Sequence, residues 1–428
     1  MNIKDIKEEF LSFLWQYRKI SGFLTSTKGE HIEVLHPGVK NNDEGPDFLG
    51  AKIRIGNTLW AGNVEIHVKS SDWDKHQHKI WAKYESVILH VVYEADKKIA
   101  RKTNEELVTV ELKNQINYKY LEKYIDLQNN TNWIPCHNNL LKVDEIIINP
   151  WLSRLLIERL ERKTSEIRKI IDNNRMDWQT SFYQWLSSCF GFKLNNLGFL
   201  MLSKSLPLNI ILKHQDHPFQ VEALLMGQAG LLLNSFKDEY TKQLKQEYDF
   251  LAKKYSLEPI DARIWKFMRT RPSNFPTIRI SQLANVISRI KYLLPELFNN
   301  PDINRISEIL SANVSDYWLN HYVFDKESIK KSKKLGTMAI HSLIINAITP
   351  FVFLYGKFHS NQLLQDNAIK LLDSIPPEEN KVTKKWKEYK IKIENAADSQ
   401  SLIELFNNYC CNKKCVHCSI GNVIILGA

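Results

Sequence analysis

FLGAKIRIGNTLWAGNVEIHVK, residues 48–69, decides the fold of the N-terminal part of this chain. Both halves of the stretch are rich in the β-branched and aromatic residues that favour strands. The Gly56-Asn57 step between them is a hairpin signal, because a two-residue turn needs residues that accept unusual backbone angles. The stretch therefore predicts two antiparallel strands joined by a tight turn.

The second half of the stretch alternates polar and apolar side chains. Residues two apart on a strand share a face, so Glu65, His67 and Lys69 are expected to point the same way. The intervening residues are expected to face a core; they are Val64, Ile66 and Val68. Asp47 stands directly before the hairpin and is expected to approach Glu65 across it.

The surrounding segments predict an α+β unit over residues 1–130, with a mixed sheet and flanking helices. Helices are expected over 3–20 and 72–84, and further strands over 31–38, 87–94 and 106–112. Residues 131–428 are expected to form a large all-α domain that ends in a cysteine cluster. Its first helix is expected to start near Pro150, and the others lie near 178–190, 216–233, 236–255, 280–298, 335–355 and 383–410.

Length and composition indicate a soluble protein of two or three domains, with 428 residues and a formal charge of +10. This charge suits an anionic partner such as nucleic acid, although a Lys-rich composition from an AT-rich genome would give the same value. No secretory signal opens the chain, and polar residues interrupt the apolar segment 338–356, which is expected to be a buried helix rather than a membrane span. Six cysteines, mostly clustered, favour a reducing cytoplasm.

Asp47 and Glu65 are the candidate metal ligands. Two carboxylates that converge at a strand edge bind a divalent cation such as Mg²⁺ or Mn²⁺ and leave room for water and a phosphate oxygen. His67 or Lys69 is then expected near the scissile phosphate. An acidic residue of the first helix, such as Glu9, is a further candidate ligand that the sequence alone does not select.

Further histidines lie near this motif, at positions 76, 78 and 90. Imidazole ligands would favour Mn²⁺ or Zn²⁺ over Mg²⁺. We assign only His67 to the site and interpret His76 and His78 as ordinary surface or packed histidines.

Asp47 after a proline, followed by Glu65-x-His67 on a strand, resembles the motif of the PD-(D/E)XK nuclease superfamily. The expected order of helix, three strands, helix and strand also resembles its restriction-endonuclease-like core. The resemblance implies that the Asp and the Glu hold the metal and that a Lys two residues after the Glu assists the chemistry. Here that position is His67, with Lys69 one step further on the same face.

Most of the chain is similar to a bacterial family of unknown function, the domain-of-unknown-function 2851 family. The segments that carry this similarity are NVEIHVKSSDW, WIPC, VEALLMGQAGLL, RPSNFPTIRISQLA and YCCNKKCVHCSIG. This similarity implies no particular activity, so the nuclease interpretation depends on the shorter motif.

The C-terminal YCCNKKCVHCSIG carries a Cys-x2-Cys pair preceded by further cysteines. Four thiolates bind Zn²⁺ or a [4Fe–4S] cluster, so a structural metal is expected to clip this tail to the first domain. The arrangement is similar to that of iron–sulfur-bearing relatives of the PD-(D/E)XK nucleases, and the alternative is a set of metal-free thiols. The expected ligands are Cys136, Cys410, Cys415 and Cys418, with Cys411 and His417 as competitors.

WKFMRTRPSNFPTIRI, residues 265–280, interleaves aromatic and basic side chains. Arg269, Arg271 and Arg279 are expected to contact phosphates, because guanidinium groups match them and aromatic faces stack on bases. The alternative is a helix end whose arginines pair with neighbouring carboxylates.

Together these features predict a metal-dependent nuclease that hydrolyses phosphodiester bonds of DNA or RNA, with nucleic acid as partner and no membrane. One alternative is a non-catalytic nucleic-acid-binding or scaffold protein that retains the fold. Another is a hydrolase of smaller phosphoesters.

Overall fold

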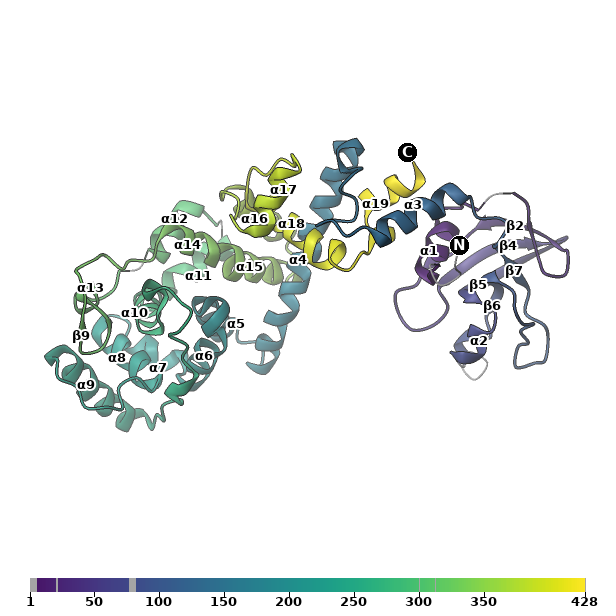
Figure 1. Cartoon of the computed structure of the whole chain (residues 1–428). Coiled ribbons are helices and arrows are strands. Elements are labelled where there is room, and N and C mark those ends of the chain that lie inside the picture. The colour runs from purple at the N-terminus through teal and green to yellow at the C-terminus, as the bar shows by residue number, and fades with distance from the viewer. Residues whose placement is uncertain (1–5, 21, 77–81, 300, 312, 428) are drawn as a thin grey trace. The chain divides into compact units, whose positions relative to one another are not determined.

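The computed structural model describes residues 6–20, 22–76, 82–299, 301–311 and 313–427 (Figure 1). The chain forms two compact units, Met1–Trp151 with Leu405–Ala428, and Leu152–Glu404. This division differs from the one expected at residue 130. The boundary falls later, inside a long helix, and the cysteine-bearing tail belongs to the first unit. A helical sequence pattern does not reveal which core a helix packs against.

A seven-stranded mixed sheet forms the centre of the first unit, which confirms the α+β class. The strands lie in the order β1-β2-β4-β5-β6-β7, with β3 also paired to β4. β5, β6 and β7 are parallel neighbours, and the other pairs are antiparallel. The strand bounds are β1 Leu24–Thr25, β2 His31–His36, β3 Val39–Lys40, β4 Phe48–Ile55, β5 Thr58–Lys69, β6 Val87–Glu94 and β7 Thr109–Glu111.

β4 and β5 form the predicted hairpin. Ile55 pairs with Thr58 across the turn, where Gly56 has a φ of +55°. At the other end the register shifts between Phe48 and Ala51, which marks a β-bulge. Bulges bend a strand and redirect its side chains, so this one sets the direction of the residues that precede β4.

Helices flank the sheet, and α1 (Glu8–Gln16) packs on β5. The helix expected over 72–84 is helical at α2 (Asp72–Lys75) and in a 3₁₀ turn, η2 (Ala82–Tyr84), while residues 77–81 lie outside the described part. The rest of the unit comprises α3 Tyr118–Asn129, η3 Leu140–Lys142, η7 Leu405–Cys410, η8 Cys415–His417 and α19 Ser419–Leu426.

α4 (Glu145–Asn173) carries the chain from the first unit into the second. It begins at Glu145, five residues before Pro150, near which the start was expected. Asp144 sets the true start, because its side chain accepts the N–H of Ile146 at 2.9 Å.

The second unit is helical, as predicted, apart from one small two-stranded sheet. Its helices are α5 Trp178–Phe190, α6 Phe192–Ser205, α7 Leu208–Lys213, α8 Pro218–Gln228, α9 Glu239–Tyr255, α10 Pro276–Ile287, α11 Ile290–Asn299, α12 Ile303–Leu310, α13 Tyr317–Asn320, α14 Thr337–Leu343, α15 Thr349–Phe358, α16 Gln362–Asp373, α17 Lys381–Glu388 and α18 Ala396–Glu404. The short segments are η4 Ala262–Ile264, η5 Pro272–Asn274, β8 His321–Val323, β9 Lys326–Glu327 and η6 Ile344–Ile348.

Within the described residues, one helical run, Thr337–Phe358, is long and apolar enough to cross a membrane, and 67% of its most apolar window is buried. It consists of α14, the π-helical turn η6 and α15. The π-turn directly precedes the Thr349-Pro350 step, where the missing proline N–H disturbs the regular bonding.

Candidate functional site

Asp47 and Glu65 lie together, and each carboxylate accepts a hydrogen bond from a backbone N–H group, one of Asp47 and one of Ile66. The N–H of Asp47 donates to Glu65 Oε2 at 3.1 Å, and the N–H of Ile66 donates to Asp47 Oδ2 at 2.9 Å. The bulge at the start of β4 places Asp47 beside β5 in this arrangement. The structure therefore brings together the two carboxylates that the sequence singles out.

Glu65 is buried, with 5% of its surface exposed. Burial raises its pKa to about 8; the N–H of Asp47 opposes this shift, and the nearby carboxylate of Glu8 adds to it. Without a cation, Glu65 is therefore mostly protonated at neutral pH.

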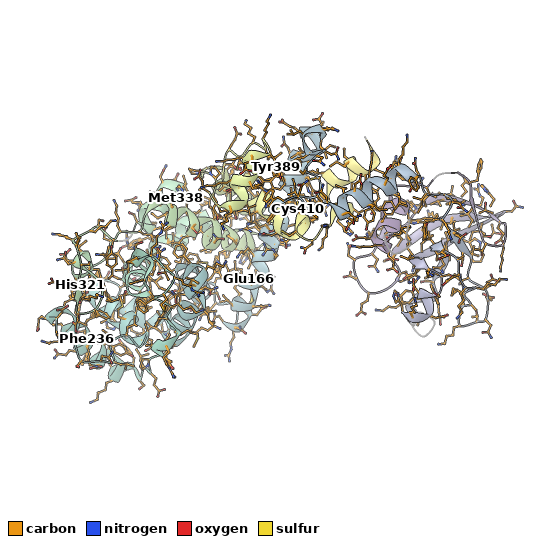
Figure 2. The ribbon with its side chains drawn as sticks, in the orientation of Figure 1. Glu166, Phe236, His321, Met338, Tyr389 and Cys410 are labelled. Carbon is orange, nitrogen blue, oxygen red and sulfur yellow. The ribbon has the colours of Figure 1, made fainter. Side chains whose placement is uncertain are left out.

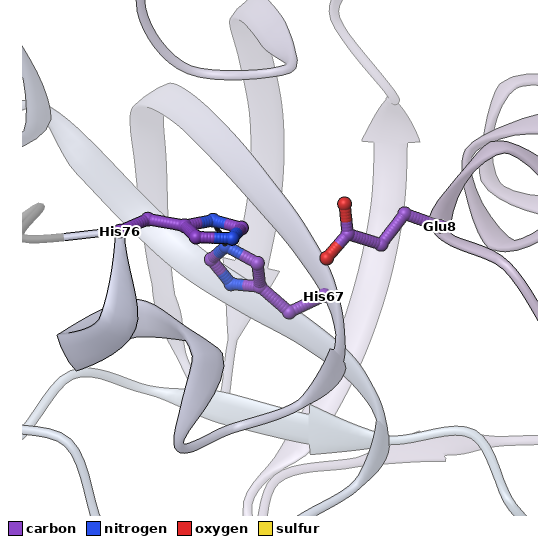
Figure 3. A group of neighbouring side chains, drawn as sticks. All are labelled: Glu8, His67 and His76. Atoms are coloured by element: carbon purple, nitrogen blue, oxygen red, sulfur yellow. Dashed lines mark hydrogen bonds between the residues drawn. The ribbon is translucent and has the colours of Figure 1, made fainter. Parts of the chain in front are cut away.

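Three histidines form a chain of contacts beside these carboxylates. His67 Nδ1 lies 2.8 Å from His90 Nε2, and His67 Nε2 lies 3.1 Å from His76 Nδ1. Glu8, the first residue of α1, places a carboxylate oxygen so that one ligand atom from each of Glu8, His67 and His76 lies within 4.8 Å of the others (Figure 3).

This donor set can hold a divalent metal. Two imidazoles and one carboxylate suit Mn²⁺ or Zn²⁺ better than Mg²⁺, which prefers oxygen ligands. The contact of His67 with His90 also fits a metal ligand, whose second ring nitrogen is normally held by a neighbour. Burial raises the pKa of Glu8, while His76 and the N–H of Val68 favour its ionised form.

Glu8 and His76 are residues that the sequence interpretation missed. Glu9, the candidate named from sequence, accepts a hydrogen bond from the Tyr124 hydroxyl at 3.2 Å and lies 3.7 Å from His417 Nε2. His76, interpreted from sequence as an ordinary surface or packed histidine, lies with Glu8 and His67 in a group that could hold a metal ion. The signal that could have found His76 is the presence of an imidazole soon after β5. His78, which had the same interpretation, lies outside the described residues.

Lys69 is not in the position expected of it, and a second lysine, Lys40, lies near Asp47 instead. Lys69 Nζ pairs with Glu94 of the neighbouring strand at 3.5 Å. Lys40 of β3 lies within electrostatic reach of Asp47 and Glu9, which oppose the lowering of its pKa by burial. The lysine side chain within electrostatic reach of Asp47 is therefore supplied by β3. This strand is too short for its pairing to be predicted from sequence.

The three arginines of the basic stretch differ in exposure. Arg269 and Arg271 are exposed, whereas Arg279 is buried on α10. Arg279 donates to Gln282 Oε1 at 2.9 Å and Asn274 Oδ1 at 2.6 Å, and burial lowers its pKa to about 10. Its guanidinium stabilises the start of α10 and does not share the exposed surface of the other two.

The cysteines also differ in how exposed they are. Cys136, Cys415 and Cys418 are buried in the first unit, Cys410 is half-buried beside them, and Cys411 is exposed. His417 lies in the same turn but contacts Glu9.

No curated protein and no solved structure matches the chain. The family described as "Protein of unknown function (DUF2851)" matches residues 8–381, which is most of the chain. The protein therefore belongs to the DUF2851 family.

Proposed function

We propose that the first unit hydrolyses phosphodiester bonds of nucleic acid with a divalent cation held by Glu8, His67 and His76. The observation that carries this proposal is the convergence of their ligand atoms within 4.8 Å, next to the linked pair Asp47 and Glu65. Three protein ligands leave positions on the cation for a water molecule and a phosphate oxygen.

The surrounding groups have complementary roles in this proposal. The Oε1 of Glu65 lies 3.7 Å from Nε2 of His67 and so beside the proposed cation. A bound cation would lower the pKa of Glu65, which could then accept the proton that the attacking water loses. Lys40, near Asp47, supplies positive charge for the developing negative charge on the phosphate. Asp47 fixes the backbone of β5 at Ile66 and so keeps His67 in place.

Two features favour nucleic acid as the substrate. The hairpin followed by the parallel strand β6, with α1 on β5, supports the restriction-endonuclease-like assignment of the sheet. The net charge of +10 and the exposed Arg269 and Arg271 suit a polyanion. Mn²⁺ or Zn²⁺ is the proposed cofactor, ahead of Mg²⁺.

A cleavage assay on single-stranded, duplex and branched DNA and on RNA tests the proposal. We expect cutting with Mn²⁺ or Zn²⁺ that EDTA abolishes and that Glu8→Gln, His67→Asn and Glu65→Gln each reduce at least about 100-fold. His31→Asn, at an exposed histidine of β2, is the matched control and should cut like the wild type. Metal-independent cutting, or no cutting with nucleic-acid binding retained, would favour the non-catalytic binding protein.

A further inference from the structure

The C-terminal cysteines lie on a sequence of tight turns. Cys410 ends the π-helical turn η7, Cys415 begins the 3₁₀ turn η8, and Cys418 directly precedes α19. The N–H of Cys418 donates to the carbonyl of Cys415 at 3.2 Å, which folds the Cys-x2-Cys pair into one turn. Both side chains of the pair are buried.

The sulfur of Cys418 receives two backbone donors. The N–H groups of Ile420 and Gly421, in the first turn of α19, donate to it. Burial raises the pKa of the Cys418 thiol, and these two N–H groups oppose that shift. The same N–H groups can hydrogen-bond to a metal-bound sulfur.

Cys136 joins this group from a loop that lies 274 residues before Cys410 in sequence. The ring of Trp133, close to Cys136 in sequence, stacks on that of Phe406, close to Cys410, with 4.4 Å between the ring centroids. The four thiols are also close enough to interact electrostatically. Cys411, next in sequence to Cys410, is exposed instead. Figure 2 labels Cys410 on the yellow C-terminal segment.

Packing fixes the backbone around the four sulfurs. Gln128 at the end of α3 donates to the carbonyl of Lys413 at 2.9 Å, and Lys413 donates in return to the carbonyl of Gln128. A Cβ at Gly421 would lie 2.2 Å from the carbonyl oxygen of Cys415, so only glycine allows α19 to approach η8 this closely. These contacts hold the backbone on either side of Cys415 in place.

We propose that Cys136, Cys410, Cys415 and Cys418 bind a metal centre through four thiolates. Three buried thiols and the half-buried Cys410 come together here from two distant segments of the chain, and a metal would deprotonate them and bind them strongly. Tetrahedral Zn²⁺ and a [4Fe–4S] cluster share this ligand chemistry. The centre holds the C-terminal segment to α3 and to the loop of Cys136, so its role is structural and independent of the hydrolytic proposal.

Metal and sulfide analysis of the full chain, purified without oxygen, tests this inference. We expect either about one zinc per chain that is bound by sulfur and no sulfide, or iron and acid-labile sulfide with broad absorption near 400 nm. Because the Glu8 group offers only nitrogen and oxygen ligands, Co²⁺ exchanged into the zinc form should show thiolate charge-transfer absorption only if the cysteines bind it. Wild-type protein with neither signal would overturn the proposal.

Serine variants assign the ligands. We expect Cys136→Ser, Cys410→Ser, Cys415→Ser and Cys418→Ser each to lose most of the sulfur-bound metal, and Cys411→Ser to keep it. Cys189→Ser, a half-buried position in the second unit, is a second control that should keep it. If a ligand variant does not fold, the wild-type spectrum still decides, and equal metal loss in Cys411→Ser and Cys410→Ser would contradict the assignment.

Discussion

Glu8 and Glu9 are consecutive on α1, yet they contact two different groups of side chains. Glu8 lies with His67 and His76, whereas Glu9 lies 3.7 Å from His417 in the cysteine turn. Because a helix advances about 100° per residue, neighbours on it face different surroundings. One turn of α1 therefore contacts both the candidate catalytic site and the frame of the cysteines.

The two glutamates provide a test variant and a matched control for metal binding. Glu8→Gln should weaken Mn²⁺ binding at least about 10-fold, because it removes a charged ligand. Glu9→Gln should change the affinity less than about 2-fold, since its partners are Tyr124 and His417. Calorimetric titration of both variants with Mn²⁺ measures this, and equal losses would contradict the assignment of Glu8 as the ligand.

His90 should affect metal affinity without touching the metal. It holds Nδ1 of His67 at 2.8 Å, which leaves the other ring nitrogen of His67 toward the cation. His90→Phe should lower Mn²⁺ affinity by about 10–100-fold, the usual effect of removing such a partner. His90→Gln, which retains a hydrogen-bonding group, should recover part of the loss. Unchanged affinity in the Phe variant would show that His67 is oriented by other contacts.

Glu222 should make the second unit less stable as the pH rises. It is buried, with Trp318 Nε1 donating to it and the hydroxyls of Tyr240, Ser281 and Ser315 nearby, and burial raises its pKa above 4.5. Above that pH the unfolded chain releases a proton that the folded protein keeps, so the free energy of unfolding falls. Glu222→Gln removes this ionisation.

Urea unfolding between about pH 5 and 8 compares Glu222→Gln with the wild type. The difference in unfolding free energy should shift in favour of the variant as the pH increases. A constant difference across this range would mean that Glu222 is already ionised in the folded protein.

Gly227 should tolerate no side chain. On α8 it packs against Tyr248 of α9, and a Cβ would lie 2.0 Å from the ring. Gly227→Ala should lower the free energy of unfolding by about 1–3 kcal/mol or more, because the two helices must move apart. Gly336→Ala, whose Cβ would meet nothing within 4 Å, is the control and should cost at most about 1 kcal/mol as a changed helix cap. Equal losses in urea unfolding would contradict this account.

The hairpin was predictable because its information is local. The strands expected over 48–55, 58–69 and 87–94 have these bounds in the structure, since β-rich runs and a Gly-Asn turn define them without help from distant residues. The approach of Asp47 to Glu65 follows from the same hairpin and was predictable for the same reason.

The rest of the site depends on tertiary structure that the sequence pattern does not contain. The rotation of α1 decides between Glu8 and Glu9, and the chain after β5 must turn back for His76 to reach His67. The burial of Arg279 follows from the packing of α10 and not from its basic neighbours. The membership of the tail in the first unit likewise depends on packing at long sequence separation.

The first unit is discontinuous in sequence, and this has a consequence for its synthesis. On the ribosome, Cys136 emerges well before its three partners, because 274 residues separate it from Cys410. At about 5–20 residues per second, the delay is roughly 14–55 s. The helical unit can therefore complete its own core first, while α3 must wait, with its contact surface for α19 uncovered, until residues 405–427 have emerged.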